Sequence, residues 1–560
     1  MNPPKWKTLR HNGILLPPPY VRQNIKFKIK GKSVELNDIQ EEMVYQWAKK
    51  KDTPYVLDTE FRKNFVNDFM GTFDKKIKFR HRDLDFEDAF RLVDQEKEMK
   101  LLLTKEERKE LAARRKAKRE ELKQKYGTAV IDGEEVELGN YMAEPPGIFI
   151  GRGKHPFRGK WKPRISQKDV TLNLDKKAKL PPGDWGGIVH ERSGVWVAKW
   201  TDKLTGKTKY VWLADTSKQK QNMDKVKYEK AIMLANNIDK IKESLYRDMS
   251  DKKKSKIATV CYLIYRTAMR VGDEKNEEEA DTVGATTLRK EHVKIDKNTI
   301  KLDFLGKDSV RWQETILLKD HEVQFKDNLL DLISNKKETD EIFDGIKSQT
   351  VNKYLSGVID GVTAKVFRTY LATRVVAKYL SEHDDLKKAS APKKLYHAKM
   401  ANLQAAIRCN HKRAIPKTFN QSLQKKKDNL KKIKAQNTWA KTEETIKKIK
   451  AANPKTEKQK QRRRERLKRL RALIKQRRQK HSERVEKQSL LINLTQNTKD
   501  YNLGTSLRNY IDPRILKAWT DEMSMEWERM YTTALQKKFL WVGKEKTSWR
   551  KVKSGVYNAD

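Results

Sequence analysis

The first 130 residues alternate between the hydrophobic periods of strands and helices. Residues 25–34 alternate apolar and polar side chains around Gly31, which predicts two short strands joined by a turn, and residues 38–50 follow a helical period. From 103 to 126 the chain is polar on nearly all helical faces. Thr104, with Glu107 three residues later, can cap this helix, and Gly127 can end it. We therefore expect an α+β lobe followed by a helix that protrudes into solvent.

Two later stretches show the period of two that is typical of strands. Residues 195–200 and 209–213 predict a β-hairpin that turns at 204–206. Residues 292–317 contain two further β-rich runs, with Leu305, Gly306, Lys307 and Asp308 at the turn between them. The second hairpin interrupts a stretch that is otherwise helical.

From Lys225 onward, helical spacing dominates. One predicted face carries Ile232, Ala235, Ile238 and Ile241, and another carries Ile257, Val260, Cys261, Ile264 and Ala268. Two more helices are expected over 363–380 and 395–409, the latter ended by basic residues and Pro416, and the tryptophan-rich stretch 519–541 is expected to dock as a last helical subdomain. The pattern indicates a packed helical domain.

The segment 421–490 has too few apolar positions for a core. It contains 26 Lys and Arg against 7 Asp and Glu, and Asn453-Pro454 divides it in two. Sparse apolar positions, among them Leu467, Leu470 and Ile474, allow a thin seam between helices. We interpret the segment as an antiparallel helical hairpin that is basic on its outside, and disorder is the alternative.

Composition identifies a polyanion as the partner. The 560 residues carry a formal net charge of +49, which repels itself unless a polyanion is bound, and nucleic acid is the obvious candidate. The longest apolar run, 257–269, is too short and too polar to span a bilayer, and the N-terminus has no apolar signal region, so neither a membrane protein nor a secreted one is expected. Cys261 and Cys409 are too few for a disulfide framework and are expected to be free thiols.

These patterns together predict a multidomain α+β protein. We expect N-terminal mixed α/β lobes, a mainly α domain with a small β-hairpin or sheet, a helical-hairpin linker and a C-terminal helical subdomain. The predicted boundaries place an N-terminal lobe at 1–125, a second lobe at 126–200, a core domain at 201–418, the linker at 419–495 and a C-terminal domain at 496–560.

The glycine-rich loops do not match a nucleotide site. Residues 151–164 form a basic, turn-rich segment suited to holding phosphates, and Arg152, Lys154 and His155 are its candidate contacts. It is not a P-loop, because Gly153 and Gly159 are wrongly spaced and Trp161 stands where Ser or Thr is needed. Near 206–208, Thr201 replaces the required first glycine, so no ATP site is expected.

The acidic stretch 273–281 is better explained as a solvated helix start than as a metal cluster, which leaves basic side chains to stabilise charge on a phosphoryl group. The candidates are Arg270, expected to end a helix, Arg368 on a helix beside Phe367 and Tyr370, Lys307 on a hairpin turn, and His411. His411 follows a helix end whose dipole is expected to favour the protonated imidazole. Each also has an ordinary structural explanation: surface charges for the arginines, a turn lysine, and a cap for the helix that ends at Cys409.

Several strings in one order resemble the eukaryotic-type DNA topoisomerases of class IB along nearly the whole chain. The nearly literal ones are Arg270–Lys275, Ala280–Gly284, Asp303–Ser309, Thr363–Tyr370, Cys409–Arg413 and the stretch Ser506–Arg514 around Tyr510. Shorter ones lie nearer the N-terminus, among them Phe61–Phe65 and Glu144–Gly147. By itself, Tyr510 would be taken for a half-buried packing residue.

The resemblance implies a role for each candidate. Tyr510 would be the nucleophile that forms a 3′-phosphotyrosyl bond. Arg270, Arg368 and His411 would bind the non-bridging oxygens, and Lys307 would protonate the leaving 5′-hydroxyl. Asn509 and Arg152, followed by Lys365 and Asp308, would contact DNA near the cleavage site.

The resemblance also implies that the enzyme relaxes positive and negative supercoils without ATP and without an essential divalent metal. It would act as a monomer clamped around double-stranded DNA, with no membrane association. It would be an intracellular, DNA-associated protein, located in the nucleus of a eukaryote or in the cytoplasm and nucleoid of a prokaryote. The long charged N-terminal tail of larger members does not precede Trp6, and the compact form would also suit an archaeal member.

Two other functions remain open from the sequence. A tyrosine recombinase also uses arginines, a lysine, a histidine and a tyrosine, but it is expected to form oligomers on specific sites and to lack the basic hairpin. A non-catalytic architectural DNA-binding protein would need only the net charge.

Overall fold

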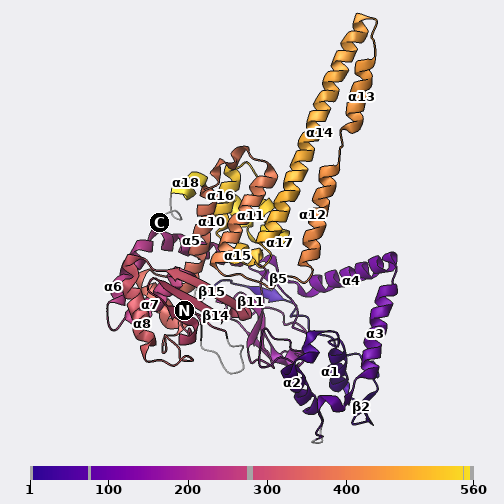
Figure 1. Ribbon diagram of the computed structural model, residues 1–560. Coiled ribbons are helices and arrows are strands. Elements are labelled where there is room, and N and C mark those ends of the chain that lie inside the picture. The colour runs from indigo at the N-terminus through magenta and orange to yellow at the C-terminus, as the bar shows by residue number, and fades with distance from the viewer. Residues whose placement is uncertain (1–3, 74–76, 274–281, 547, 555–560) are drawn as a thin grey trace. The chain divides into compact units, whose positions relative to one another are not determined.

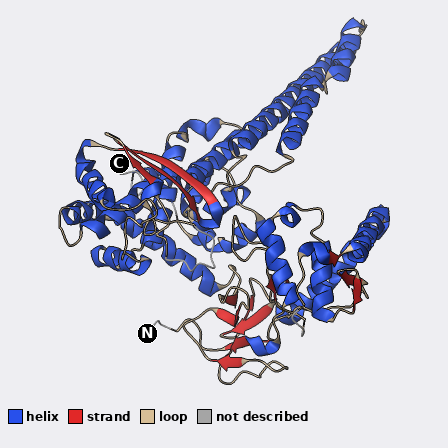
Figure 2. Cartoon of the chain, turned by 60° about the horizontal axis from the view of Figure 1, so that its bottom comes forward, coloured by secondary structure: helices blue, strands red, loops and turns tan. Residues whose placement is uncertain are grey.

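A computed structural model describes residues 4–73, 77–273, 282–546 and 548–554. Most of these residues are helical, and the strands form small separate sheets (Figure 2). The contacts divide the chain into two compact units. The first comprises Met1–Lys225, Glu274–Val283 and Leu305–Ser309, and the second comprises Val226–Asp273, Gly284–Phe304 and Val310–Asp560. Apart from Asp273, the predicted helix start at 273–281 lies outside the described residues.

An aromatic core organises the N-terminal part of the first unit. The predicted turn at Gly31 joins two strands of a small sheet, and the helices after it bury Trp47, Phe65 and Phe69 against Phe27 of that sheet. The rings of Trp47 and Phe65 stack with centroids 4.4 Å apart. The elements are β2 (Phe27–Ile29), β3 (Lys32–Val34), β4 (Leu84–Asp85), α1 (Asp38–Ala48), α2 (Thr59–Met70) and α3 (Glu87–Leu102).

The predicted charged helix is confirmed as α4 (Lys105–Tyr126). Thr104 caps it, Glu107 completes the capping box, and Gly127 is its C-cap. None of its residues is buried. Leu103 is the C-cap of α3, and Figure 1 shows α3 and α4 meeting at a sharp corner.

The second core of the first unit is built from strands. The hairpin predicted around residue 205 is confirmed as β11 and β12, which belong to a four-stranded sheet. Val170, Leu172, Val197 and Val211 of this sheet pack in one cluster with Leu9 of a second sheet. The strands are β1 (Leu9–His11), β5 (Thr128–Ile131), β6 (Glu134–Glu137), β9 (Val170–Asn173), β10 (Gly187–Val189), β11 (Trp196–Thr201) and β12 (Thr208–Trp212), with the separate pair β7 (Gly147–Ile148) and β8 (Trp161–Lys162).

The helix α5 (Lys218–Asn236) begins in the first unit and continues into the second, which contains most of the helices predicted after Lys225. The face predicted over 232–241 is shared by two helices, because Asn237 begins a new one. The C-terminal tryptophan-rich stretch is also helical and buries Trp519. The α-helices outside the linker are α6 (Ile238–Met249), α7 (Ser255–Thr267), α8 (Val323–Ser334), α9 (Ser348–Val358), α10 (Ala364–Ser381), α11 (Ala391–Arg408), α15 (Leu503–Asn509), α16 (Pro513–Glu522), α17 (Thr533–Lys538) and α18 (Trp549–Ser554).

The β-rich interruption forms a three-stranded sheet in which β13 (Val293–Ile295) lies beside β14 (Thr299–Gly306), and β14 beside β15 (Val310–Leu317). The single turn η5 (Lys307–Ser309) joins the two long strands, so Lys307 lies at a hairpin turn as predicted.

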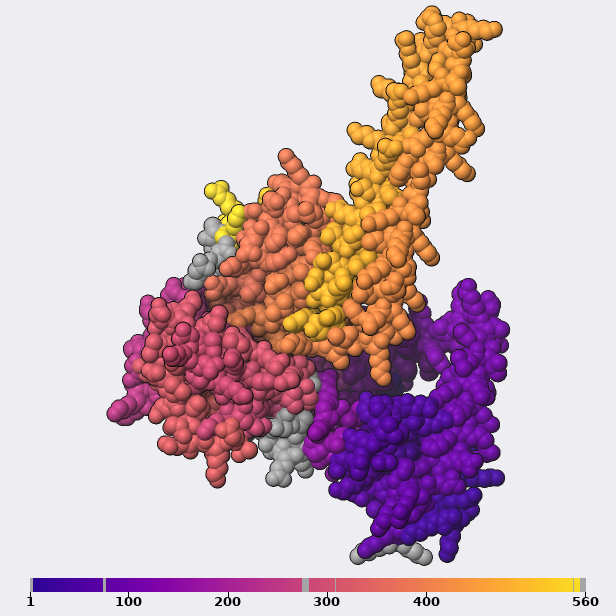
Figure 3. Space-filling model, viewed as in Figure 1, coloured from indigo at the N-terminus to yellow at the C-terminus, as the bar shows by residue number. Residues whose placement is uncertain are grey.

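The basic segment is helical, as its pattern predicts, and it is broken at Asn453-Pro454. Its first half is nevertheless two helices, α12 (Phe419–Ala435) and α13 (Ala440–Ala451), which pack against the single helix α14 (Glu457–Asn497). The seam is thin: Ile433 and Ile446 are buried, and Arg477 of α14 crosses it to the Thr442 hydroxyl at 2.7 Å. In Figures 1 and 3, this hairpin, in orange and yellow, extends away from α10 and α11. The space-filling view of Figure 3 shows long side chains that stand out along it.

Candidate active site

Tyr510 lies at a junction between two short helices. It is the C-cap of α15, and two residues later Asp512 caps α16, whose first residue is Pro513. Proline is favoured at the first helical position and restricts the residue before it, so Ile-Asp-Pro enforces the break. The Tyr510 N–H donates to the Ser506 carbonyl at 2.9 Å, and the Tyr510 side chain is half-buried. The local sequence thus ends one helix at the tyrosine and starts the next two residues beyond it.

His411 is positioned by the end of α11. Asn410 adopts a left-handed conformation with φ of 50°, and the His411 N–H donates to the Ala406 carbonyl at 2.8 Å. A left-handed residue followed by this longer hydrogen bond is a Schellman motif, in which Asn is one of the few residues tolerated besides Gly. The turn brings His411 into the interior, where 5% of its surface is exposed.

The two ends of the basic hairpin meet beside His411. The Asn502 N–H donates to the His411 carbonyl at 2.7 Å, and the Arg413 N–H donates to the Asp500 carbonyl at 2.8 Å. Lys412 and Tyr501 form an antiparallel bridge between these bonds. The chain therefore leaves at His411 and returns beside it, which delivers Tyr510 to this site across about a hundred residues of sequence.

Arg368, His411 and Tyr510 are in mutual contact. The His411 and Tyr510 rings stack with centroids 5.3 Å apart, and the Arg368 guanidinium lies over the Tyr510 ring at 5.0 Å. Arg368, on the buried face of α10, is 2% exposed. The structure therefore brings three of the five predicted catalytic residues together within the second unit.

The hydrogen-bond partners of Arg368 are all neutral. Its guanidinium donates to the carbonyls of Ala268 and of Cys409 (3.0 Å), and it lies 3.4 Å from His411 Nε2. Within the described residues, Arg368 has no carboxylate partner, and its Nε has no hydrogen-bond partner. A buried cation without a counter-ion is costly, so this arrangement is suited to binding an anion.

The prediction that His411 favours its protonated form is wrong. Burial, together with the positive charges of Arg368 and Arg270, lowers the pKa of His411 to about 3. The helix dipole would act in the opposite direction, but it is worth about 1 kcal/mol and is outweighed by burial and by two like charges. His411 is therefore a neutral imidazole in the protein without a ligand.

Arg270 lies beyond the end of α7 instead of ending it. Ala268 adopts φ of 56° and terminates the helix at Thr267, and the same turn directs the Ala268 carbonyl to Arg368. The Arg270 carbonyl accepts from the Ala285 N–H at 2.9 Å. Arg270 is half-buried, and its charge acts on both His411 and Cys409.

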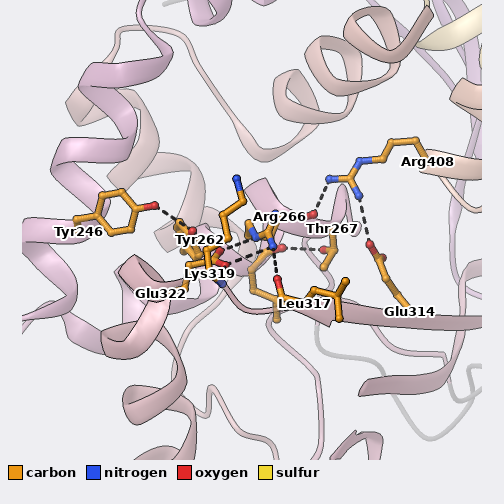
Figure 4. Close-up of polar contacts among 10 residues, drawn as sticks. Tyr246, Tyr262, Arg266, Thr267, Glu314, Leu317, Lys319, Glu322 and Arg408 are labelled. Carbon is orange, nitrogen blue, oxygen red and sulfur yellow. Dashed lines mark hydrogen bonds and ion pairs between the residues drawn. The ribbon is translucent and has the colours of Figure 1, made fainter. Parts of the chain in front are cut away.

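A polar network holds the end of α7 against α11 and β15 (Figure 4). Arg408 of α11 donates to the Arg266 carbonyl at 2.5 Å and pairs with Glu314 of β15 at 3.2 Å, while Arg266 pairs with the buried Glu322 at 2.6 Å. Burial raises the pKa of Glu314, opposed by the charge of Arg408. Because Arg266 lies two residues before Ala268, this network also fixes the carbonyl that Arg368 uses.

The predicted DNA-binding loop of the first unit lies against the Lys307 turn. Gly153 has φ of 58°, and a Cβ there would meet Ser309 Oγ at 2.3 Å, so only glycine fits. Arg152, Lys154 and Lys307 are exposed, and His155 is half-buried with its ring 5.0 Å from that of Phe149. Lys307 therefore belongs, with this loop, to the first unit. That Lys307 protonates the leaving 5′-hydroxyl remains a prediction.

The other predicted DNA-binding residues lie near Tyr510 and Arg368 in the chain. Asn509 is exposed on the last turn of α15, with its amide donating to the Thr505 carbonyl at 3.1 Å. Lys365 is exposed on the first turn of α10, one turn before Arg368. The side chain of Asp308 lies outside the described part of the chain.

Sequence reasoning missed two buried hydroxyls. Thr373 Oγ1 donates to the Tyr510 carbonyl at 3.2 Å and accepts from the Asp512 N–H at 3.0 Å, which ties α10 to both sides of the tyrosine. Ser506 Oγ lies 2.7 Å from His411 Nδ1. Ser506 precedes Tyr510 by four residues, so helical spacing could have indicated it. Nothing in the sequence around Thr373 indicates its partner.

Neither a metal cluster nor a membrane span is found in the described ranges. No group of three or more His, Cys, Asp or Glu side chains there could hold a metal ion. No helix in the described part of the chain is long and apolar enough to cross a bilayer. Cys261 and Cys409 are buried free thiols, as predicted.

Comparisons with known proteins identify the family of the chain. Three family descriptions match the chain in order: the DNA binding fragment of eukaryotic DNA topoisomerase I over residues 4–213, its catalytic core over 216–444, and a C-terminal topoisomerase domain over 482–551. Similar proteins include DNA topoisomerase 1 beta of Arabidopsis thaliana (36% identical) and DNA topoisomerase 1 of Drosophila melanogaster (35%) and Homo sapiens (33%).

Each of these alignments covers 96% of this chain. The chain spans 58% of the length of the plant relative, 54% of the fly relative and 70% of the human relative. A match at this identity, over more than two thirds of the human protein and nearly all of this chain, establishes the family. The chain belongs to the eukaryotic DNA topoisomerase I family.

Proposed function

We propose that this protein is a type IB DNA topoisomerase that relaxes positive and negative supercoils by cutting and resealing one strand. The observation that carries the proposal is Arg368, a buried cation whose partners are all neutral, in contact with both His411 and the Tyr510 ring. A phosphodiester supplies the missing anion, and Tyr510 is the nucleophile beside it.

The chemistry assigns one task to each residue. The Tyr510 phenol loses its proton to water as its oxygen attacks the phosphorus and forms a 3′-phosphotyrosyl bond, while the bond to the 5′-oxygen breaks and Lys307 supplies the proton to that oxygen. Arg270, Arg368 and His411 donate hydrogen bonds to the non-bridging oxygens as their charge develops. The phosphotyrosyl ester keeps the energy of the broken linkage, so attack by the free 5′-hydroxyl reseals the strand without ATP.

The partner that we propose is double-stranded DNA, held by its phosphates. The exposed loop with Arg152 and Lys154, together with Asn509 and Lys365, would contact the backbone near the cut. The segments 1–125 and 126–200 would form a cap on one face of the duplex, and the helical hairpin would lie along the DNA beyond the cut and slow its rotation. Such contacts give weak sequence preference and steep salt dependence. We also propose that one copy suffices, without a nucleotide or an essential divalent metal.

The test is relaxation of supercoiled plasmid in EDTA without ATP. Relaxation of both signs of supercoil supports the proposal, and no relaxation would falsify it. A covalent adduct at the 3′ end of the cut strand should form with the wild type and should be absent in Tyr510→Phe. Tyr531→Phe is the matched control, because Tyr531 is a buried tyrosine of the same subdomain. It should keep the adduct.

The same assay separates the two alternatives. A tyrosine recombinase would join two specific sites, whereas an architectural protein would bind the plasmid without forming an adduct. The structure favours the topoisomerase over the recombinase at one point, the basic hairpin formed by α12, α13 and α14, which a recombinase is expected to lack.

A further inference from the structure

The hydrogen bonds of His411 determine which ring nitrogen carries the proton. A guanidinium can only donate hydrogen bonds, so the 3.4 Å contact from Arg368 requires an unprotonated His411 Nε2. Because the imidazole is neutral, Nδ1 then carries the hydrogen and donates it to Ser506 Oγ at 2.7 Å. The protein without DNA therefore holds His411 with its hydrogen on Nδ1.

Contact with a phosphate requires the opposite arrangement. A phosphate oxygen only accepts hydrogen bonds, so His411 must present an N–H at Nε2, the nitrogen on the side of Arg368. A second proton on the ring would provide it. However, the ring is buried, and its charged neighbours are the cations Arg368 of α10 and Arg270 of the segment after α7, which disfavour a second proton. The titratable side chains of Tyr510, beyond α15, and of Cys409, after α11, also lie nearby. The alternative is to move the single proton from Nδ1 to Nε2.

We propose that Ser506 is a positioning residue that lets His411 make this change of tautomer when phosphate binds. The proposal rests on the function proposed above. A hydroxyl can both accept and donate, so Ser506 accepts from Nδ1–H in the free protein and donates to Nδ1 once the hydrogen is on Nε2. The ring carries one proton before and after the change: Nδ1 releases its hydrogen to solvent water, Nε2 takes one up from solvent water, and the Ser506 hydroxyl hydrogen turns to Nδ1. The neutral imidazole is then a donor to phosphate without becoming an imidazolium.

The position of Ser506 supports the assignment. Its side chain is fully buried, so no water replaces it at Nδ1, and its carbonyl accepts from the Tyr510 N–H at 2.9 Å. One residue therefore holds the backbone of the nucleophile and the second nitrogen of the histidine. When the guanidinium of Arg368 turns to the phosphate, Nε2 loses its donor and becomes free to carry the hydrogen.

The test compares the pH dependence of cleavage in the wild type, Ser506→Ala, Ser506→Thr and the control Ser489→Ala. Ser489 also carries a hydroxyl on a helix, but it bonds only to the Val485 carbonyl of its own helix α14. We expect the wild type, Ser506→Thr and Ser489→Ala to cleave at nearly constant rate from pH 6.5 to 8. In Ser506→Ala, Nδ1 of the donor tautomer has no hydrogen-bond partner, and a second proton on the ring would have none either. The donor tautomer is therefore disfavoured, and cleavage should be about tenfold slower throughout this pH range.

A second measurement does not depend on activity. Nitrogen-15 NMR of histidine-labelled Tyr510→Phe, which holds DNA without cutting it, should show His411 protonated at Nδ1 alone, and at Nε2 alone after a duplex oligonucleotide is added. Cleavage by Ser506→Ala at the wild-type rate, or a proton that stays on Nδ1 with DNA bound, would overturn the proposal. If Ser506→Ala does not fold, the NMR of Tyr510→Phe and the profile of Ser506→Thr still decide it. A wild type that relaxes no plasmid refutes the proposed function instead, and the NMR measurement identifies this case separately.

Discussion

Two groups of cations in the second unit use the same residue types in opposite ways. Arg368 on α10 is 2% exposed and has only neutral partners, whereas most arginines along α14 are exposed to solvent. The buried guanidinium of Arg368 has lost its hydration, a cost in free energy that a bound anion would offset. The exposed arginines of α14 remain hydrated. The hairpin carries a large share of the net charge, whereas the chemistry that we propose depends on Arg368 in the interior. Burial without a counter-ion, and not the number of cations, therefore distinguishes the proposed site.

The exposed and the buried cations should also differ in what they contribute to folding stability and to DNA binding. An exposed cation adds little to folding stability, because its ion pairs are solvated and screened, yet each contact with a phosphate adds to DNA affinity. A buried cation with fixed partners acts on geometry and on the pKa of its neighbours, as the lowered pKa of His411 shows. Substitutions in the two groups should thus be separable by assay.

The largest effect is expected from Arg368→Lys, which keeps the charge and removes the forked geometry. The ammonium cannot reach the Ala268 and Cys409 carbonyls and a phosphate oxygen together, so strand cleavage should be about 100- to 1,000-fold slower. Single-turnover cleavage of an oligonucleotide measures it.

Arg484→Lys on α14 is the matched control, because Arg484 is exposed and the exchange keeps its charge. It should change the cleavage rate less than twofold. Equal losses in the two variants would remove the distinction between buried and exposed cations.

The next effect concerns the hydroxyl that ties α10 to the Tyr510 backbone. Thr373→Val keeps the shape and leaves the Asp512 N–H and the Tyr510 carbonyl without this partner. Such a loss costs about 1–3 kcal/mol of unfolding free energy. We also expect slower cleavage with unchanged DNA affinity.

Thr373→Ser keeps the hydroxyl and should recover most of both losses. Thr495→Val on α14, where the hydroxyl bonds only to the Leu491 carbonyl of the same helix, should be nearly neutral in urea unfolding. A Thr373→Val protein as stable and as active as the wild type would show that the bridge does not position Tyr510.

The lowered pKa of His411 predicts a loss of stability in mild acid. Above pH 6.5 the histidine is neutral in both the folded and the unfolded chain and contributes no pH dependence. As the pH falls from 6.5 to about 3, only the unfolded chain takes up the proton, so unfolding is favoured, by about 2 kcal/mol at pH 5.

His411→Gln removes this contribution. The difference in unfolding free energy between the wild type and His411→Gln should therefore shift by about 2 kcal/mol in favour of the variant between pH 7 and pH 5. Urea unfolding of the DNA-free proteins at both pH values measures the shift. Parallel curves would mean that the histidine is not held neutral.

Much of the fold was predictable, because local signals agree with the final structure where an element is defined by its own residues. The capping box of α4 and the turn between β11 and β12 are examples. The exact ends of helices were less predictable. Asn237 divides the face over 232–241, and the left-handed Ala268 ends α7 before Arg270, because tertiary contacts decide these positions.

The candidate site residues were identified from the family resemblance, but their environment could not be predicted from it. Placing Arg368, His411 and Tyr510 together requires the hairpin to close at the Lys412–Tyr501 bridge, and no local pattern encodes that contact. The charge state of His411 was mispredicted for the same reason. The helix dipole can be inferred from sequence, whereas burial and the two neighbouring arginines appear only in the folded chain.

The smallest effect on folding is expected from the hairpin itself. Replacing six of its exposed cations by glutamine keeps helix propensity and removes six charges: Lys458, Arg462, Arg464, Arg466, Lys468 and Arg469. The unfolding free energy should change by less than about 0.5 kcal/mol, since these side chains are solvated. Relaxation at low salt should remain.

DNA affinity should respond differently. The slope of log affinity against log salt concentration should fall by about 0.9 for every one of these six positions that contacts a phosphate. A control with lysine at the four arginine positions keeps all six charges and should retain the wild-type slope. If instead the glutamine variant unfolds more easily by over 1 kcal/mol, or cuts DNA as poorly as Arg368→Lys, the hairpin cations act on structure or chemistry, and the contrast with the buried site fails.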